Sequence, residues 1–441
     1  MFHNFTWQIL FCTTVVFLVV GFVWLFLPAQ PNRNSRPWVN DITEQDSPIL
    51  DQLLDRNDPV MKLVLANPDL FRLQIIFSQV NRNQKNQPFI KHHTWRLDTL
   101  EYFYPASMVK LPTAALSLEK IRQLKIPDLD PYTKMQVSGS TSPCHRPTAG
   151  NEASNTWGHA CLVQYLKHAL VSSDNISYDR LYEFVGQQEL NETLHERGYR
   201  SANITQRYGA YCSLSENKYT QRVRFHDKED QLIYDQPARQ SPRNFEQKMR
   251  TRIGRAKKLD DGSLVDEPYD FTGRNFMNLK DLHEVLMSIM MPMAMARDQV
   301  FHLEKEDYKV LHKYMSMYPT ESTDPWIDRS YYTTTRMKYL LYGNVAAPDP
   351  NVRIFNKVGF AHGFLIDCAY IVDFDKKVEF FVSALIFTNR KGVTGDGNYE
   401  YFSIGMPFLK RLGEILLQNE RKRLRKYDPD LEFYIHDYSS Y

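Results

Sequence analysis

The chain has almost no excess of charge of either sign. Its 54 basic and 52 acidic residues leave a net charge of +2, whereas proteins that bind nucleic acids rely on a surplus of lysine and arginine. It also lacks internal repeats and low-complexity tracts, and 43% of its residues are hydrophobic, enough for a packed core. We therefore expect a globular protein that acts on something other than a nucleic acid or another polyanion.

Cysteine is scarce as well, with five residues in 441. Cys12 belongs to an N-terminal apolar run, and no Cys-x-x-Cys pair occurs among Cys144, Cys161, Cys212 and Cys368. This spacing argues against a thiolate metal site, and no motif indicates an organic cofactor. The four later cysteines form one or two disulfides in an exported protein, or they are buried free thiols, and the sequence leaves both open.

Charge is missing altogether from residues 9–27, ILFCTTVVFLVVGFVWLFL. A helix of this length, at about 1.5 Å per residue, spans a bilayer, and the residues after it form a poor cleavage site. We expect residues 1–28 to be a transmembrane anchor or an uncleaved signal. By the positive-inside rule, Arg33 and Arg36 would place the rest of the chain in the cytoplasm, but the catalytic interpretation given below overrides this indication.

Composition divides the rest of the chain into further segments. Residues 29–48 are polar, contain Pro and Asn, and are predicted to be a linker. Residues 49–425 form the main domain, and residues 426–441 a C-terminal tail. Within the main domain, residues 217–275 are rich in Arg, Lys and Asp, and we expect a polar insertion that contains a surface hairpin.

The order of the apolar patterns predicts an α+β fold, an α/β sandwich. A hairpin is expected at residues 71–80 and 92–97, then a helix from about Ser107 to Leu124, and helical patterns dominate residues 156–340. Three strands and an amphipathic helix follow, at residues 352–360, 364–374, 378–388 and 399–427. The simplest packing joins the early and late strands into one antiparallel sheet flanked by helices, with a mainly helical subdomain inserted between them.

The stretch YFYPASMVKLPTAAL places Lys110 in an otherwise apolar run, one helical turn after Ser107. Positions three apart share a helix face, so the lysine can hydrogen-bond the serine hydroxyl. An amine in apolar surroundings has a lowered pKa, and a neutral amine can accept the serine proton. Pro112 predicts either a kink or a first turn that is not regular α-helix. Taken alone, the pair is more often a helix-capping serine and a lysine that reaches solvent.

Two further signals follow in the sequence. In the triplet SDN, Ser173 can pass a proton to a leaving group and Asn175 can bind a substrate amide, although these residue types also favour turns and caps. In KVG, at a strand end, Lys357 can hold a carboxylate and Gly359 lets a substrate lie close to the strand. Taken alone, this lysine is more often an edge-strand residue that discourages aggregation.

Together, and in this order, the three signals resemble the penicilloyl-serine transferases, the superfamily of class A β-lactamases and penicillin-binding proteins. YPASMVKLPTAAL resembles the nucleophile helix of that superfamily, SSDN its second element and KVG its strand motif, and the resemblance covers about residues 45–425. It implies that Ser107 is the acylated nucleophile, that Lys110 is its base and that Ser173 is a proton shuttle.

The resemblance also implies how a substrate is held. Asn175 would contact the substrate and the base lysine, and Lys357 would orient a substrate carboxylate and support Ser173. The backbone N–H groups of Ser107 and Phe360 would form the oxyanion hole.

Two positions depart from the pattern of the superfamily. Val358 stands where a serine or threonine is usual, which removes a hydroxyl from the carboxylate site. Gly209 or Ala210 stands where class A β-lactamases carry the glutamate that helps hydrolyse the acyl-enzyme, and Glu216 is out of register. Without such a base, acylation would proceed while hydrolysis of the acyl-enzyme is slow.

Three functions remain open at this stage. The first is an exported, membrane-anchored serine hydrolase of class A β-lactamase type that opens β-lactams or a related amide or ester. The second is a penicillin-binding-protein-like transpeptidase or carboxypeptidase that acts on cell-wall peptides, and the third is a non-catalytic protein that binds through the same cleft. All three place the domain outside the cytoplasmic membrane, in the periplasm or at the cell surface, and we expect no metal, cofactor or nucleic-acid partner.

Overall fold

A computed structural model of the chain describes residues 39–439. The residues inside this range that it does not describe are 139–143, 145–148, 150–151, 153–154, 210–211, 246, 248, 325–326, 329, 331, 344 and 346. The predicted membrane span at residues 9–27 and part of the linker therefore lie outside the described residues. Among the residues that are described, no helix combines the length and the apolar character needed to cross a membrane.

A five-stranded antiparallel sheet lies at the centre of the domain, in the order β12-β13-β14-β1-β2. Its strands are β1 (Gln74–Arg82), β2 (Pro88–Trp95), β12 (Val352–Ala361), β13 (Phe364–Asp373) and β14 (Val378–Phe387). Ile75 of β1 lies opposite both Trp95 of β2 and Ala384 of β14. The predicted hairpin, the three late strands and their union in one sheet are confirmed.

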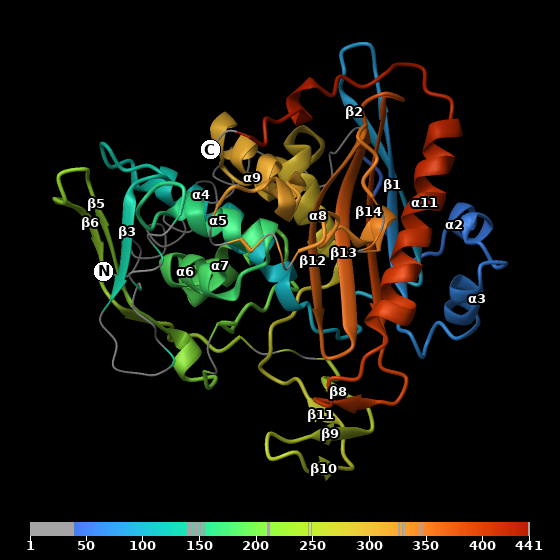
Figure 1. Cartoon of the computed structure of the whole chain (residues 1–441), viewed down its shortest axis with the longest axis horizontal. Helices are drawn as coiled ribbons and strands as arrows, with labels where there is room; N and C mark the ends of the chain where they lie inside the picture. Colours follow the sequence, from blue (N-terminus) through green and yellow to red (C-terminus); the bar gives the residue numbers. More distant parts are fainter. Residues whose placement is uncertain are drawn as a thin grey trace, which may run out of the picture. The chain divides into compact units, whose positions relative to one another are not determined.

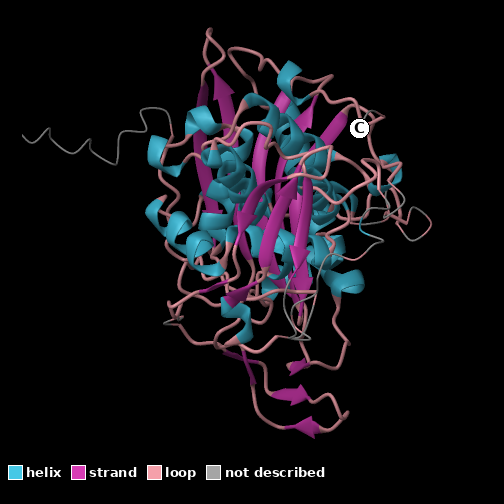
Figure 2. Cartoon of the chain, turned by 90° about the vertical axis from the view of Figure 1, so that its left-hand side faces the viewer, coloured by secondary structure: helices cyan, strands magenta, loops and turns pink. Residues whose placement is uncertain are grey.

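Helices cover both faces of this sheet (Figure 1). Every residue of β13 and β14 is buried, as expected for strands with packing on both sides. The helices of one face are α8 (Leu279–Met290) and α9 (Lys305–Ser316), and those of the other are α2 (Pro48–Leu53), α3 (Pro59–Ala66) and α11 (Met406–Lys422). Figure 2 shows the strands between the two helical layers. The predicted mixed fold of helices and strands is thus confirmed.

A mainly helical part of the chain follows the hairpin. Its helices are α4 (Lys110–Leu124), α5 (Leu162–Val171), α6 (Asn175–Val185) and α7 (Gln187–Glu196). The α6 helix begins after Asp174, whose carboxylate accepts a hydrogen bond from the Ser177 backbone N–H at 2.6 Å. It ends at Gly186, whose φ of 88° favours glycine.

The regular elements of the predicted insertion at residues 217–275 are mostly short strands. Its expected hairpin, β5 (Arg222–His226) and β6 (Leu232–Gln236), is confirmed, and β5 also pairs with β3 (Lys134–Ser138). Its other strands are β4 (Tyr219–Thr220), β7 (Arg239–Gln240), β8 (Arg252–Ile253), β9 (Ala256–Lys258), β10 (Leu264–Val265) and β11 (Tyr269–Asp270). The last four form an arm beyond the end of the central sheet (Figure 1), where β9 pairs in parallel with β15 (Val393–Thr394).

The C-terminal segment, predicted as a tail, packs against the domain. Tyr434 is buried, and its hydroxyl donates a hydrogen bond to the Met290 carbonyl oxygen at 2.7 Å. The Tyr438 hydroxyl lies 2.8 Å from Ser316 Oγ, and the Arg353 guanidinium lies 4.2 Å from the centre of the Tyr438 ring. The residues after α11 therefore contribute to the packed core.

The four cysteines within the described residues realise both alternatives that the sequence left open. Cys144 and Cys212, 68 positions apart, form a disulfide. Cys161 and Cys368 are free thiols, and both are buried. The disulfide ties the segment before α5 to the segment after α7.

Candidate active site

Ser107 lies on a tight turn that leads into α4. Residues Ala106–Val109 form one turn of 3-10 helix, and the regular helix begins at Lys110. Pro112 is therefore in the first turn of α4, where a missing backbone N–H is tolerated. Of the two alternatives that Pro112 raised, the irregular first turn is the correct one. The Ser107 side chain is half-buried, and the Tyr208 hydroxyl holds the turn by donating to the Ala106 carbonyl oxygen at 2.6 Å.

Strand β12 passes directly against this turn. A Cβ atom at Gly359 would lie 2.3 Å from the Pro105 carbonyl oxygen and 3.2 Å from the Met108 nitrogen. No side chain fits such a space. The sequence suggested that Gly359 leaves room for a substrate, and the structure shows that the backbone before Ser107 takes up that room.

We expect Gly359→Ala to lower the free energy of unfolding by about 1–3 kcal/mol, because the added methyl group pushes β12 away from the Ser107 turn. Urea denaturation of both proteins, followed by tryptophan fluorescence, measures the difference. An unchanged denaturation midpoint would contradict the close approach of the two segments.

Lys110 is fully buried, and its amine points to the loop between α5 and α6. Its Nζ donates to the Ser173 carbonyl oxygen at 2.5 Å and to Asn175 Oδ1 at 2.7 Å, and lies 3.4 Å from Ser173 Oγ. Burial lowers the pKa of Lys110 to about 7, against the opposing effect of the Asp174 and Asp179 carboxylates. The predicted hydrogen bond from Lys110 to the Ser107 hydroxyl is not formed between these two described residues, so this detail of the sequence-based prediction is corrected.

Ser173 connects the two lysines that the sequence singled out. Its φ of 60° is unusual for a residue with a side chain, and it turns the chain between α5 and α6. The Ser173 hydroxyl accepts a hydrogen bond from Lys357 Nζ at 2.9 Å. Backbone outliers of this kind occur often at functional sites, where surrounding contacts hold them in place.

Lys357 enters the site from β12. It is only 1% exposed, and its Nζ also donates to the Val358 carbonyl oxygen at 2.9 Å. Burial, together with the nearby charge of Lys110 and of Lys338, lowers the pKa of Lys357 well below its usual value. The neighbouring Val358 is 2% exposed and belongs to the apolar cluster on the α11 face of the sheet, so it presents little surface to a substrate.

The remaining predicted residues lie at the edges of the site. Asn175 is exposed at the start of α6, and its Oδ1 accepts the hydrogen bond from Lys110. Phe360 follows Gly359 on β12, the outermost strand of the central sheet. Its ring is half-buried, 5.4 Å from the ring of Tyr401.

Sequence reasoning missed three residues near the site: Asp179, Tyr208 and Lys338. Asp179 follows Asn175 by four positions on α6, a spacing that the sequence does show. Tyr208 and Lys338 reach the site by long-range contacts that leave no local pattern. Lys338 Nζ donates to Asn356 Oδ1 at 2.7 Å, and burial lowers the pKa of Lys338 to about 7.

The three buried amines have no contacting counter-ion among the residues that the structure describes. Backbone carbonyls, amide oxygens and the Ser173 hydroxyl accept their hydrogen bonds, and no carboxylate does. Carboxylates act on the amines only from a distance, Asp174 and Asp179 on Lys110 and Asp367 on Lys338 and Lys357. In the described part of the chain, no cluster of three His, Cys, Asp or Glu side chains is placed to hold a metal ion.

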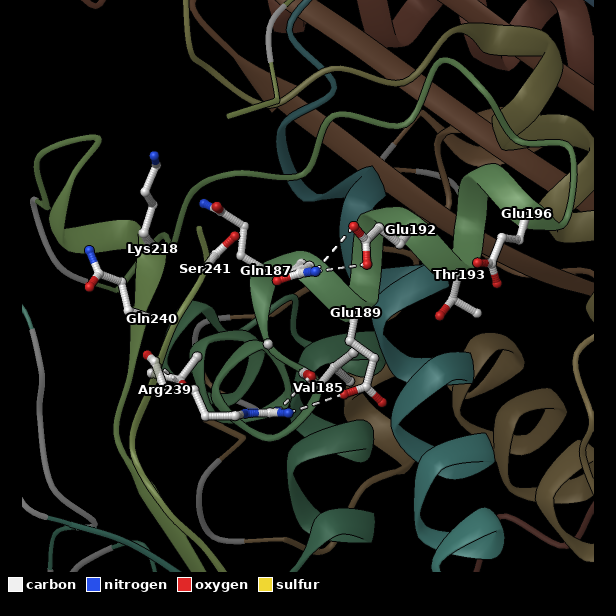
Figure 3. Close-up of a pocket in the computed structure, with 13 residues that line it drawn as sticks. Val185, Gln187, Glu189, Glu192, Thr193, Glu196, Lys218, Arg239, Gln240 and Ser241 are labelled. Carbon is white, nitrogen blue, oxygen red and sulfur yellow. Dashed lines mark hydrogen bonds and ion pairs between the residues drawn. The ribbon is translucent and has the colours of Figure 1, made fainter. Parts of the chain in front are cut away.

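A separate pocket of about 270 Å³ lies between α7 and the β4–β7 pair (Figure 3). In Figure 3 the Arg239 side chain points to Glu189, and their ion pair measures 3.4 Å. The Gln188 side-chain amide donates a hydrogen bond to the Glu192 carboxylate at 3.0 Å. None of the residues predicted for catalysis lines this pocket, so we place the candidate active site at Ser107.

A serine on the turn before a buried lysine, with a second serine that accepts hydrogen bonds from two amines, is an arrangement suited to acyl transfer. Residues 91–249 match the model of the β-lactamase enzyme family. This segment contains Ser107, Lys110, Ser173 and Asn175, and the match confirms the resemblance to the superfamily of serine β-lactamases and penicillin-binding proteins. It supports a serine hydrolase of that kind.

Comparison with known proteins gives two further results. No curated protein sequence matches the chain. Similar solved structures include a β-lactamase from Sphaerobacter thermophilus DSM 20745, with 12% identity, a TM-score of 0.44 and coverage of 83% of this chain and 97% of that one. A halotolerant bacterial β-lactamase has 13% identity, a TM-score of 0.46 and coverage of 83% and 99%. A β-lactamase from Desulfarculus baarsii DSM 2075 has 13% identity, a TM-score of 0.45 and coverage of 82% and 98%.

Proposed function

We propose that this protein is a serine hydrolase of class A β-lactamase type, in which a β-lactam or a related amide or ester acylates Ser107. The observation that carries the proposal is the position of Ser173. It accepts hydrogen bonds from Lys110 and from Lys357, and Lys110 follows Ser107 by three residues on the same turn. These contacts support the proposal, in which Ser107 is the nucleophile, Lys110 the base, Ser173 the proton donor and Lys357 the anion-binding group.

The proposed acylation uses each of these groups once. Neutral Lys110 takes the proton of the Ser107 hydroxyl while Oγ bonds to the carbonyl carbon of the substrate. As the bond between that carbon and the leaving nitrogen breaks, Ser173 gives its proton to the nitrogen and regains one from Lys110. The proton of Ser107 thus ends on the leaving group, and both lysine and second serine return to their first state.

The substrate would be held by the edges of the site. Lys357 faces a substrate carboxylate, and Asn175 borders the rest of the bound molecule. The backbone N–H groups of Ser107 and Phe360 would stabilise the negative charge that develops on the carbonyl oxygen. The absence of a contacting carboxylate on the three amines supports an anionic substrate.

We also propose an exported protein, held to the membrane by residues 9–27, with the domain in the periplasm or at the cell surface. The Cys144–Cys212 disulfide supports this location, because disulfides persist in oxidising compartments and are rare in the cytosol. An alkaline phosphatase fusion after Tyr441 tests it, since that reporter is active only outside the cytoplasm. An inactive fusion that is present in full length would contradict the proposal.

A second candidate function is a penicillin-binding-protein-like enzyme that acts on cell-wall peptides. The feature in its favour is that, by the resemblance, Gly209 or Ala210 stands where class A β-lactamases carry the glutamate of the hydrolytic step, and neither residue has a carboxylate. An enzyme of this kind would form a long-lived acyl-enzyme with a β-lactam.

Two reporter substrates on the full-length chain in detergent separate these functions, with Ser107→Ala as the control. Steady hydrolysis of a chromogenic cephalosporin, lost in the control, supports the β-lactamase. A stable fluorescent penicillin label on Ser107, without turnover, supports the cell-wall enzyme. Neither signal from a folded protein would overturn both and leave a binding role.

The pH dependence of acylation provides another prediction. We expect the rate of Ser107 labelling to rise with pH until about 7 and then to level off, because Lys110 must be neutral to accept a proton and its pKa is about 7. Stopped-flow fluorescence between pH 5 and pH 9 measures the rate. A rate that falls as the pH rises through 7 would show that the protonated amine is the active form.

A further inference from the structure

The loop at Tyr208 and Gly209 is tied to a carboxylate of helix α6. The backbone N–H of Tyr208 donates to Asp179 Oδ1 at 2.8 Å, and that of Gly209 donates to Asp179 Oδ2 at 2.9 Å. A Cβ atom at Gly209 would lie 2.7 Å from Asp179 Oδ2. The carboxylate of Asp179 therefore occupies the space in which a side chain of residue 209 would begin.

This carboxylate belongs to the surroundings of the base lysine, because its charge raises the pKa of Lys110 against the effect of burial. Asp179 is one helical turn after Asn175, which accepts a hydrogen bond from Lys110, so both residues share one face of α6. The rings next to the Asp179–Gly209 contact border the same amine, since Lys110 Nζ lies 6.0 Å from the Tyr178 ring and 5.8 Å from the Tyr208 ring. The Tyr208 hydroxyl also donates a hydrogen bond to the carbonyl oxygen of Ala106, the residue before Ser107.

Asp179 has no cation in contact among the described residues. The nearest arginine in the loop, Arg207, forms its ion pair with Glu183 instead, at 2.7 Å. Asp179 is 9% exposed, and burial raises its pKa to about 7, against the opposing effect of the two N–H groups and of Arg207. Each of its oxygens accepts one backbone hydrogen bond and keeps a further lone pair for a proton.

We propose that Asp179 is the general base that activates water for hydrolysis of the acyl-enzyme, and that it replaces a side chain at position 209. The proposal rests on acylation of Ser107. Asp179 takes a proton from water while the water oxygen bonds to the acyl carbon, and the bond from that carbon to Ser107 Oγ then breaks. Asp179 passes that proton to neutral Lys110, and the ammonium of Lys110 gives a proton to Oγ as the bond breaks, so the water ends as a hydroxyl on the product and a hydrogen on the serine.

The test is Asp179→Asn in the full-length chain, with fluorescent penicillin as the probe. The variant is expected to form the acyl-enzyme at a rate within about threefold of the wild type, whereas its acyl-enzyme persists at least about 100-fold longer, the usual contribution of a general base. Intact-protein mass spectrometry after removal of free penicillin follows both steps. An unchanged lifetime, or equal losses in acylation and hydrolysis, would overturn the role of Asp179 and leave Ser107 acylation standing.

Asp174→Asn is the matched control, because Asp174 is the other carboxylate that acts on the charge of Lys110. We expect it to leave the ratio of hydrolysis to acylation unchanged. An equally long-lived acyl-enzyme in this control would show that negative charge near Lys110, rather than a base, speeds hydrolysis.

The wild-type protein offers a test that needs no variant. Lys110, Arg207 and Glu183 are the charged groups that act on Asp179, and hydrolysis should rise with pH through about 7 as the carboxylate loses its proton. A hydrolysis rate that is constant from pH 5 to pH 9 would overturn the proposal. A wild-type acyl-enzyme that never hydrolyses would do the same, and a protein that forms no acyl-enzyme at all would overturn the proposed function with it.

Discussion

Lys110→Met is expected to slow acylation of Ser107 by about 10³-fold or more at neutral pH, equivalent to about 4 kcal/mol in the barrier. Methionine keeps most of the length and the apolar stem of lysine, so the core around α4 stays filled. It removes the only basic group that lies within one turn of Ser107 on the helix. The rate of penicillin labelling, followed by intact-protein mass spectrometry, measures the loss.

A second buried lysine of the same helix provides the control. Lys120 is 7% exposed, its Nζ donates to Glu189 at 2.7 Å, and burial lowers its pKa to about 8. Lys120→Met therefore removes another buried amine from α4 without touching the site. Labelling should stay within a few-fold of the wild type in this variant. Wild-type labelling in Lys110→Met would contradict the role of Lys110 as the base.

Arg82→Met is expected to lower the free energy of unfolding by about 3–5 kcal/mol. Arg82 on β1 forms two hydrogen bonds to Glu379 on β14, at 2.6 and 2.8 Å, and both side chains are buried. Because the arginine neutralises a carboxylate in the core, its removal leaves Glu379 charged and without a cation, or forces it to take up a proton. Urea denaturation at pH 7 measures the change.

An exposed ion pair serves as the control for the buried pair of Arg82 and Glu379. Lys309 and Glu306 lie 3.0 Å apart on the surface of α9, with side-chain exposures of 44% and 68%. Such pairs contribute little, because water screens the charges and the side chains lose freedom. Lys309→Met should leave the denaturation midpoint almost unchanged. An unchanged denaturation midpoint in Arg82→Met as well would show that the buried ion pair does not stabilise the sheet.

Local patterns in the sequence were sufficient to predict the elements that carry the site. The apolar strands β1, β12, β13 and β14 and the helix after Ser107 each show a pattern within about ten residues. The union of the early and late strands in one sheet followed from a general packing rule, whereas the pairing of β1 with β14 was seen only in the structure. The hairpin in the insertion was also predictable, because its charged turn separates two alternating segments.

The contacts around the lysines could not be predicted in the same way. The Lys110 amine donates to Ser173 and Asn175 and not to the Ser107 hydroxyl, and this choice of partners depends on the path of the chain between α5 and α6. Burial of Lys338, the pairing of Cys144 with Cys212 and the room that Asp179 takes at Gly209 depend on segments far apart in the chain. None of these long-range contacts produces a local pattern in the sequence.

The sequence by itself determined which chemical groups are present and on which elements they stand: a serine and a lysine three residues apart, a second serine on a turn, and a lysine at the end of a strand. Tertiary structure alone decided that Ser173 accepts hydrogen bonds from both Lys110 and Lys357. It also decided that Asp179 of α6 fills the space at residue 209. The reason is physical, since periodicity acts over a few residues, whereas desolvation and hydrogen bonding of a buried charge depend on every segment that folds around it.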